Sequence, residues 1–217
     1  MGLLDDLVEP FARVEPDRVA AALREGWGAD VVALTLLDTE RDDTFRVDLG
    51  DGSRLLAKVA HPNDSAELLD LQDSALAAVA RRDPELPVPR VIPGDAVIDA
   101  RLPLRRGGEL LGRLSRALAG FEHPAADRIL PWDLRRVPDL APYTDEPVIL
   151  DAIARYTAEV SPGLAAAPQQ IVHSDFHPEN VLADEAGTIT GVIDFGDIVR
   201  TARVCDVGVA LGYLVRD

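Results

Sequence analysis

Two adjoining stretches decide the fold: His173-Ser-Asp-Phe-His-Pro-Glu-Asn-Val-Leu182 and Ile189-Thr-Gly-Val-Ile-Asp-Phe-Gly-Asp197. Residues 184–187, which lie between them, are Asp, Glu, Ala and Gly, the composition of a turn, and the chain on either side is apolar or β-branched. This pattern predicts a β-hairpin. We therefore expect the side chains of Asn180 and Asp194 to emerge at the same end of that hairpin.

The spacing of the polar residues in these stretches is typical of phosphoryl transfer. Asp175 precedes Asn180 by five residues, and a later Asp-Phe-Gly begins at Asp194. In kinase-like enzymes the first Asp is the base that accepts the proton of the attacking hydroxyl, and the Asn and the later Asp hold magnesium. Asn180 and Asp194 supply the hard oxygen ligands that Mg²⁺ prefers. The pattern predicts Asp175 as the base and Asn180 and Asp194 as the metal ligands.

A zinc site is an alternative interpretation of the same segment. His173, Asp175 and His177 alternate along the chain, so on a β-strand all three would face one side and could bind zinc, as in metal-dependent hydrolases. Against this, Pro178 interrupts the strand immediately, and the matching Asn and Asp-Phe-Gly would then be coincidences. In the phosphoryl-transfer interpretation, His173 braces the loop and does not react.

Lysine usage gives a second, independent signal. Lys58 is the only lysine of the chain, in which arginine otherwise supplies the permanent positive charges. It lies in Arg54-Leu-Leu-Ala-Lys-Val-Ala60, an apolar strand pattern that follows the Asp51-Gly52 turn. A kinase carries on such a strand the lysine that contacts the α- and β-phosphates of the nucleotide. We predict that Lys58 binds these phosphates, although a single lysine could also fall there by chance.

Composition excludes several classes of function. The 217 residues carry a formal net charge of −16 with no Lys/Arg run longer than a pair, which disfavours nucleic acid and anionic membranes as partners. Cys205 is the only cysteine, so no internal disulfide can form. No stretch is apolar enough for a signal peptide or a membrane span. We therefore expect a cytoplasmic protein that acts on a small molecule.

The predicted elements, strands that include the Lys58 strand followed by helices, stand in kinase order and predict an α+β fold. The likeness to kinases implies two lobes, a small antiparallel sheet lobe and a shortened, mainly helical lobe. We expect a nucleotide-binding lobe over residues 1–93, a linker or shortened hinge over 94–107 and a catalytic lobe over 108–217. The expected elements are a helix within 10–28, three strands within 31–60, a helix over 65–82, a short strand near 96–98, and helices over 109–121, 148–160 and 202–214.

With Lys58, Asp175, Asn180 and Asp194 in this order, the chain resembles the aminoglycoside phosphotransferase and choline kinase-like superfamily of small-molecule kinases. Within it, the sequence is most similar to the hydroxylysine kinase-like branch. The stretches that carry this resemblance are Leu69-Asp-Leu-Gln-Asp73, Phe121-Glu-His-Pro124, Trp132-Asp-Leu134 and Ile193-Asp-Phe-Gly-Asp197.

The resemblance implies a protein-kinase-like fold, ATP, Mg²⁺, and an amino-alcohol, hydroxylated amino acid or aminoglycoside-like acceptor. It also implies an acidic partner for Lys58 on the helix over 65–82, which would be Asp70 or, one turn earlier, Glu67. The chain stops soon after Asp194, where the resembled enzymes continue with a helical region that binds the acceptor. An alternative is therefore a truncated or degenerate kinase-like module that acts through binding, as a dimer or as part of a longer protein.

Overall fold

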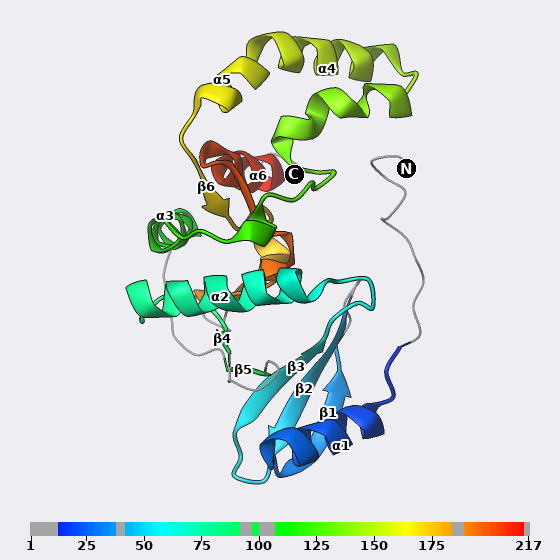
Figure 1. Ribbon diagram of the computed structural model, residues 1–217, viewed down its shortest axis with the longest axis vertical. Helices are drawn as coiled ribbons and strands as arrows, with labels where there is room; N and C mark the ends of the chain where they lie inside the picture. Colours follow the sequence, from blue (N-terminus) through cyan, green and yellow to red (C-terminus); the bar gives the residue numbers. More distant parts are fainter. Residues whose placement is uncertain (1–12, 38–41, 92–96, 100–106, 184–188, 215–217) are drawn as a thin grey trace.

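The computed structural model describes residues 13–37, 42–91, 97–99, 107–183 and 189–214. In these ranges the chain is a mixed α+β structure, with a sheet at one end of the long axis and helices at the other (Figure 1). The helices are α1 (Pro16–Trp27), α2 (Ala66–Arg82), α3 (Gly107–Ala117), α4 (Pro147–Glu159), α5 (Ser161–Ala166) and α6 (Val204–Leu214). Four 3₁₀ segments are η1 (Pro124–Ala126), η2 (Leu134–Tyr143), η3 (Pro178–Asn180) and η4 (Phe195–Asp197).

The larger sheet has five antiparallel strands in the order β1-β2-β3-β5-β4. Their bounds are β1 (Val31–Leu36), β2 (Asp43–Leu49), β3 (Arg54–Val59), β4 (Arg90–Val91) and β5 (Val97–Asp99). The turn between β2 and β3 is the predicted Asp51-Gly52 turn, in which Gly52 has the positive φ of 82° that glycine tolerates best. The three strands predicted within 31–60 are confirmed, and the short strand predicted near 96–98 is β5.

Helix α1 covers one face of this sheet (Figure 1). Pro16 lies at its first turn, where proline is well tolerated, and Gly28 ends it in the left-handed conformation at φ 64°. Leu23 of α1 packs with Phe45 and Val47, which are fully buried on β2. The helix predicted within residues 10–28 is confirmed, and it begins at Pro16-Asp17, the pair expected to open it.

The main core lies around α2. Ser65 caps this helix by accepting a hydrogen bond from the N–H of Leu68, as Ser does at helix N-termini. Its residues Leu71, Ala75 and Val79, spaced by four, are fully buried and face α3 and the strands that follow. Burial of this apolar stripe joins the middle of the chain to its C-terminal part.

Two small antiparallel pairs carry the segment quoted first from the sequence. β6 (Gln169–Val172) pairs with β9 (Val199–Ala202), and β7 (Val181–Ala183) pairs with β8 (Ile189–Val192). Val181 lies opposite Val192, so the residues just before β7 and just after β8 meet at one end. The predicted hairpin is confirmed, and its turn residues lie outside the described ranges.

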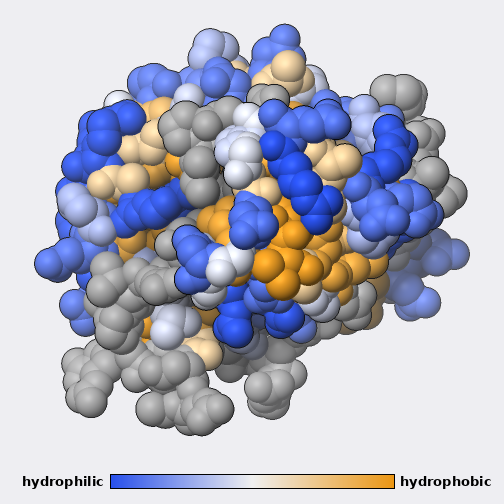
Figure 2. Space-filling view, turned by 90° about the horizontal axis from the view of Figure 1, so that it is seen from below, coloured by the Kyte–Doolittle hydropathy of each residue, from blue (hydrophilic) through white to orange (hydrophobic). Residues whose placement is uncertain are grey.

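The surface carries apolar side chains at both ends of the molecule. Seen from the sheet end, apolar residues gather in one patch (Figure 2). On β1, the edge strand of the larger sheet, Val32 and Leu36 are exposed. At the far end, α4 and α5 form an arm (Figure 1). Among the described helices, none has the length and apolar character needed to cross a bilayer.

Candidate active site

The loop that follows β6, residues 173–180, is termed the catalytic loop here. It leaves the strand through Ser174, which has a positive φ of 69°, an uncommon conformation for a residue other than glycine. The N–H of Ser174 donates a 2.7 Å hydrogen bond to Oδ1 of Asp206, at the start of α6. Because Asp206 is only 1% exposed, burial raises the pKa of its carboxyl above the ordinary value. A buried carboxylate thus fixes the first turn of the loop.

His173 links the catalytic loop to β8. Its Nε2 lies 3.0 Å from the carbonyl oxygen of Ile193, and the N–H of Asp175 donates to its Nδ1 at 3.3 Å. A carbonyl oxygen only accepts, so Nε2 of His173 carries the proton and donates it. Nδ1 carries no proton and accepts the hydrogen bond from Asp175. His173 is fully buried and both of its nitrogens are occupied, which is the bracing arrangement predicted from the sequence.

Asp175 is held by its neighbours in the loop. Nδ2 of Asn180 donates to Oδ2 of Asp175 at 2.7 Å and to its backbone carbonyl at 2.9 Å. Nε2 of His177 lies 3.2 Å from the same carboxylate oxygen, and the His177 ring stacks on Tyr213 of α6 with ring centres 4.5 Å apart. These contacts of the Asp175 side chain all use Oδ2, and one quarter of the side-chain surface stays exposed.

Asp194 follows β8 at the mouth of the hairpin. It adopts the left-handed conformation at φ 59°, and its Oδ1 accepts the N–H of Gly196 at 3.1 Å. Next to it Phe195 is buried and packs edge-on against His173, with ring centres 4.8 Å apart. Burial alone would raise the pKa of Asp194, but the ammonium of Lys58 and the N–H of Gly196 outweigh it and hold the pKa below its ordinary value.

Lys58 projects from β3 toward Asp194, which comes from a segment 136 residues away. Its Nζ lies 3.5 Å from Oδ1 of Asp194 and 2.6 Å from Oδ2 of Asp42, which directly precedes β2. Burial alone would lower the pKa of Lys58, but these two carboxylates raise it above the ordinary value. The lysine therefore stays charged at neutral pH.

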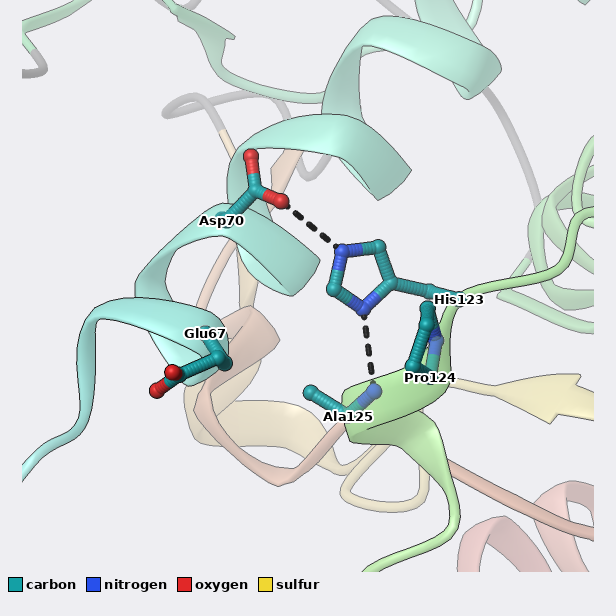
Figure 3. A pocket seen from close by; sticks show the side chains of 5 residues that line it. All are labelled: Glu67, Asp70, His123, Pro124 and Ala125. Carbon is teal, nitrogen blue, oxygen red and sulfur yellow. Dashed lines mark hydrogen bonds and ion pairs between the residues drawn. The ribbon is translucent and has the colours of Figure 1, made fainter.

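The structure corrects the predicted partner of Lys58. Asp70 lies 3.0 Å from Nε2 of His123, and with Glu67 it lines a separate pocket of about 440 Å³ (Figure 3). Neither Asp70 nor Glu67 pairs with Lys58. The Asp70 and Glu67 side chains project from α2 toward η1 and solvent. The Lys58 ammonium is instead neutralised by Asp42 and Asp194.

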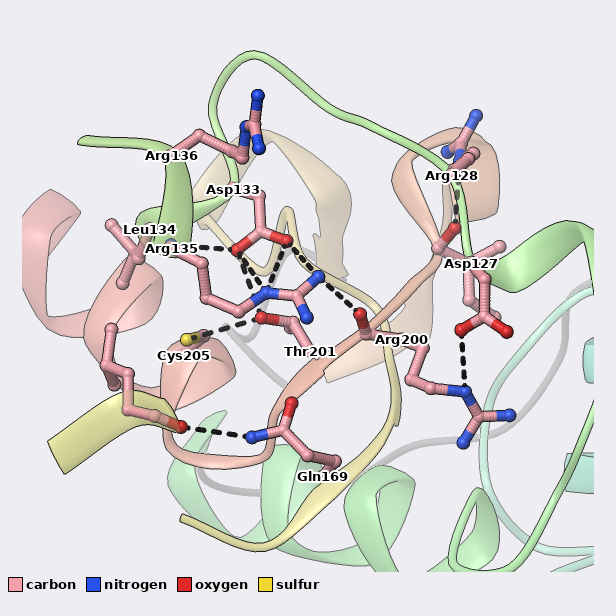
Figure 4. A network of polar contacts seen from close by, with 12 residues as sticks. Asp127, Arg128, Asp133, Leu134, Arg135, Arg136, Gln169, Arg200, Thr201 and Cys205 are labelled. Carbon is pink, nitrogen blue, oxygen red and sulfur yellow. Dashed lines mark hydrogen bonds and ion pairs between the residues drawn. The ribbon is translucent and has the colours of Figure 1, made fainter. Parts of the chain in front are cut away.

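A buried polar network supports the loop from behind. Asp133, 3% exposed, accepts hydrogen bonds from the N–H and guanidinium of Arg135 and from the hydroxyl of Thr201 on β9 (Figure 4). Arg135 also donates to the carbonyl oxygen of Arg200. Because β9 pairs with β6, this network fixes the strand from which the catalytic loop emerges. Cys205, whose thiol pKa is raised by burial, packs against the same Thr201.

The catalytic loop, Asp194 and Lys58 border one cleft of about 1270 Å³. Lys58, Asp175, Asn180 and Asp194 all line it. Among the described lining residues, Lys58 is the only Lys or Arg, whereas six carry carboxylates: Asp42, Asp64, Asp175, Glu179, Asp194 and Asp197. Such a cleft can hold a divalent cation between its carboxylates and a phosphate at its lysine.

Comparison with known proteins assigns the family. The profile of the phosphotransferase enzyme family matches residues 33–217, which include every cleft residue named above. The chain belongs to this family. No curated protein sequence matched it.

Solved structures with the same fold include several small-molecule kinases. Amicoumacin kinase hAmiN, in complex with AMP-PNP, Ca²⁺ and Ami, is 13% identical with a TM-score of 0.63, over 93% of this chain and 70% of the kinase. A putative fructosamine-3-kinase from Thermobifida fusca YX-ER1 is 23% identical with a TM-score of 0.60, over 92% and 80%. A microcompartment-associated aminopropanol kinase is 18% identical with a TM-score of 0.58, over 90% and 74%. At these identities the likeness shows the fold, and it confirms the predicted kinase-like α+β fold.

The donor set of this phosphotransferase-family cleft fits Mg²⁺. Asn180 uses its amide nitrogen on Asp175, and both polar contacts of Asp194 use Oδ1, so an amide oxygen and a carboxylate oxygen remain outside these contacts. Among the described residues, no group of three or more His, Cys, Asp or Glu could hold a metal ion. Magnesium in phosphate-binding sites usually has one or two protein oxygens as ligands, and phosphate and water oxygens complete its coordination shell.

The zinc alternative is contradicted by the same geometry. His173, Asp175 and His177 do not converge as three ligands, because both nitrogens of His173 are taken by backbone groups and His177 is turned toward Tyr213. The residue after His173 has a positive φ, which breaks the strand alternation that the zinc interpretation required.

Sequence reasoning missed two participants of the cleft. Asp42 was not singled out in the sequence, and Tyr213 lies in a helix to which no function was assigned. A signal for Asp42 was present, since it lies just before the strand that pairs with the Lys58 strand, with Thr44 opposite Lys58. No sequence signal identifies Tyr213, because its contact with His177 depends on how α6 packs.

Proposed function

We propose that this chain transfers the γ-phosphoryl group of ATP, in a Mg²⁺-dependent reaction, to the hydroxyl of a small molecule that also carries an amino group. The observation that carries the proposal is the meeting of Lys58, Asp175, Asn180 and Asp194 in one cleft. In this proposal residues 1–93 form the nucleotide lobe, 94–107 the linker and 108–217 the catalytic lobe.

Each residue has a distinct part in the proposed reaction. Lys58 binds the phosphates as a point charge, and Asn180 and Asp194 hold the metal ion, which neutralises charge on the phosphoryl oxygens. Asp175 accepts the proton of the acceptor hydroxyl while the hydroxyl oxygen attacks the γ-phosphorus of ATP. The bond between this phosphorus and the β–γ bridging oxygen breaks, and ADP leaves. Asn180 and His177 keep the Asp175 carboxylate in place through Oδ2.

The charge of the cleft supports an amine-bearing acceptor. Its carboxylates outnumber its one lysine, and Trp132 and Tyr213 add aromatic faces that attract cations. An amino-alcohol or hydroxylated amino acid, including a hydroxylysine-like one, and an aminoglycoside-like compound share this chemistry. One of the solved structures with this fold is named an aminopropanol kinase, and aminopropanol is an amino-alcohol, which is consistent with this class.

The test is a transfer assay with ATP, Mg²⁺ and a panel of amino-alcohols, hydroxylated amino acids and aminoglycosides. We expect ADP release that depends on one acceptor class, and a loss of about 100- to 10,000-fold in Asp175→Asn, because that variant keeps the shape of the base and removes its basicity. Undiminished transfer by Asp175→Asn would refute the assignment of the base.

A second candidate function is a kinase-like module that acts through binding. It is favoured by exposed apolar side chains on two helices, Val148, Ile149 and Leu150 on α4 and Val204, Val207 and Leu211 on α6. Such faces are common at protein interfaces, including dimers. A folded chain that binds a protein partner or itself, and transfers no phosphate to any acceptor of the panel, would favour this candidate over the enzyme.

A further inference from the structure

The nearest acid to Lys58 comes from the chain between β1 and β2 and not from α2. Oδ2 of Asp42 lies 2.6 Å from Nζ of Lys58, whereas Oδ1 of Asp194 lies 3.5 Å away. Asp70, on α2, is occupied with His123. Lys58 is therefore bound chiefly by a residue that precedes β2.

Asp42 is itself held at two points. Its Oδ1 accepts the N–H of His61 at 3.2 Å, while its Oδ2 contacts Lys58. Lys58 and His61 lie three residues apart at the end of β3, so the carboxylate bridges the strand end. The Asp42 side chain is only 13% exposed, so water screens this contact weakly.

The next residue ties the same segment to the chain before α1. Asp43 is fully buried, and its carboxylate accepts the N–H of Val14 at 2.6 Å and the guanidinium of Arg13 at 2.8 Å. Arg13 also donates to the carbonyl oxygen of Asp42 at 3.2 Å. These bonds fix the backbone at Asp42 and so the direction of its side chain.

We propose that Asp42 is the acid that positions Lys58 for the nucleotide phosphates, and that Arg13 and Asp43 hold Asp42 in place. The inference rests on the proposed nucleotide site. A lysine ammonium on a four-carbon stem has many rotamers, and a fixed carboxylate beside it restricts them before the phosphates arrive. Asp42 acts through Lys58 and is a positioning residue.

The single lysine allows a direct test. In the full chain labelled with ε-¹³C-lysine, the only lysine signal belongs to Lys58, and its relaxation at a fixed neutral pH measures how freely the end of this side chain moves. We expect the order parameter of this signal to fall in Asp42→Asn, because the charged contact at 2.6 Å that restricts the side chain is weakened. Asp70→Asn, a matched change on α2, should leave it unchanged. An unchanged order parameter in Asp42→Asn would overturn the proposal.

Nucleotide binding supplies the second readout. Calorimetric titration of Mg·ATP should show affinity about 10- to 100-fold weaker in Asp42→Asn, the range for loss of a hydrogen bond to a charged group. Asp42→Glu should restore part of the loss, and Arg13→Ala should weaken binding in the same direction by a smaller factor. Equal or tighter binding by Asp42→Asn would contradict positioning, because it would mean that Asp42 competes with the phosphates.

The two readouts separate this inference from the proposed function. The Lys58 relaxation is measured without nucleotide, so it reports the pairing whether or not the chain is a kinase. If Asp42→Asn frees the Lys58 side chain as expected but the wild-type chain binds no nucleotide, the result would contradict the proposed function and, with it, the role of Asp42 toward phosphates.

Discussion

The catalytic loop and the Lys58 site hold their charged groups by different kinds of contact. In the loop, Asp175 is fixed by Asn180 and His177, which lie five and two residues away. Lys58 is fixed by Asp42 and Asp194, which lie 16 and 136 residues away. The first arrangement is local in sequence and the second depends on how separate elements meet.

This difference explains which of the two was readable from sequence. A local constellation keeps its spacing wherever the segment folds, so the positions of Asp175 and Asn180 can be compared with a motif. A pair between distant elements requires the sheet, its register and the adjoining loop to be known. The resemblance placed the acidic partner of Lys58 on α2, at Asp70 or Glu67, but in the structure Asp42, from the chain before β2, takes this place.

The largest effect should come from breaking the local arrangement. Asn180→Ala removes both bonds to Asp175 and an oxygen that would hold the metal ion. Transfer in the steady-state assay should fall at least about 100-fold, the typical result of a misplaced reacting group. A transfer rate within a few-fold of wild type would show that the loop does not depend on this contact.

The support of the loop by Asp206 should be visible in stability. Asp206→Ala leaves the buried N–H of Ser174 without its acceptor, which costs about 1–3 kcal/mol. Urea unfolding should show this loss, whereas Asp151→Ala on the exposed part of α4 should change the unfolding free energy by less than about 0.5 kcal/mol. Equal stability of the two variants would remove Asp206 from the account.

The pH dependence of stability sharpens the same point. Burial raises the pKa of Asp206 in the folded protein, so its contribution to stability is fully present below the unfolded pKa of about 4 and is lost as the pH rises through the folded pKa. Asp206→Asn cannot titrate. Its unfolding free energy relative to wild type should therefore increase as the pH rises above about 4; a difference that stays constant with pH would contradict the burial effect.

The smallest effect is expected at the acid that the sequence favoured as the partner of Lys58. Asp70→Asn removes a contact with His123 in which the Asp70 side chain is 71% exposed, so stability should change by less than about 1 kcal/mol. Affinity for Mg·ATP, measured by calorimetry, should match wild type. A marked loss of affinity would restore α2 as the source of the partner.

Most of the fold could be predicted from local patterns. The strands within 31–60, the helix capped by Ser65 and the hairpin between Asn180 and Asp194 follow from alternation, capping and turn composition. The β6–β9 pair and the extended 3₁₀ segment η2 were not predicted. Short strands of four residues and a helix containing two prolines carry little periodic signal, and tertiary packing decides them.

The candidate site was predictable only in part for the same reason. The positions of Asp175, Asn180 and Asp194 in one cleft agree with the motif, and the roles assigned to them remain predictions. Asp42 escaped prediction because its contact with Lys58 depends on the pairing of β2 with β3. Its side chain is placed by His61 and by Lys58 itself, neither of which marks it in the sequence.

The most direct test of the account is calorimetric titration of ATP into the full chain with and without Mg²⁺, for wild type, Lys58→Ala and Asp194→Asn. Asn is chosen at position 194 because it tolerates the left-handed conformation found there. The account predicts Mg²⁺-dependent binding by wild type that is lost or strongly weakened in both variants. Absence of binding by a folded wild-type chain, or binding that neither substitution affects, would contradict a nucleotide site built on Lys58 and Asp194.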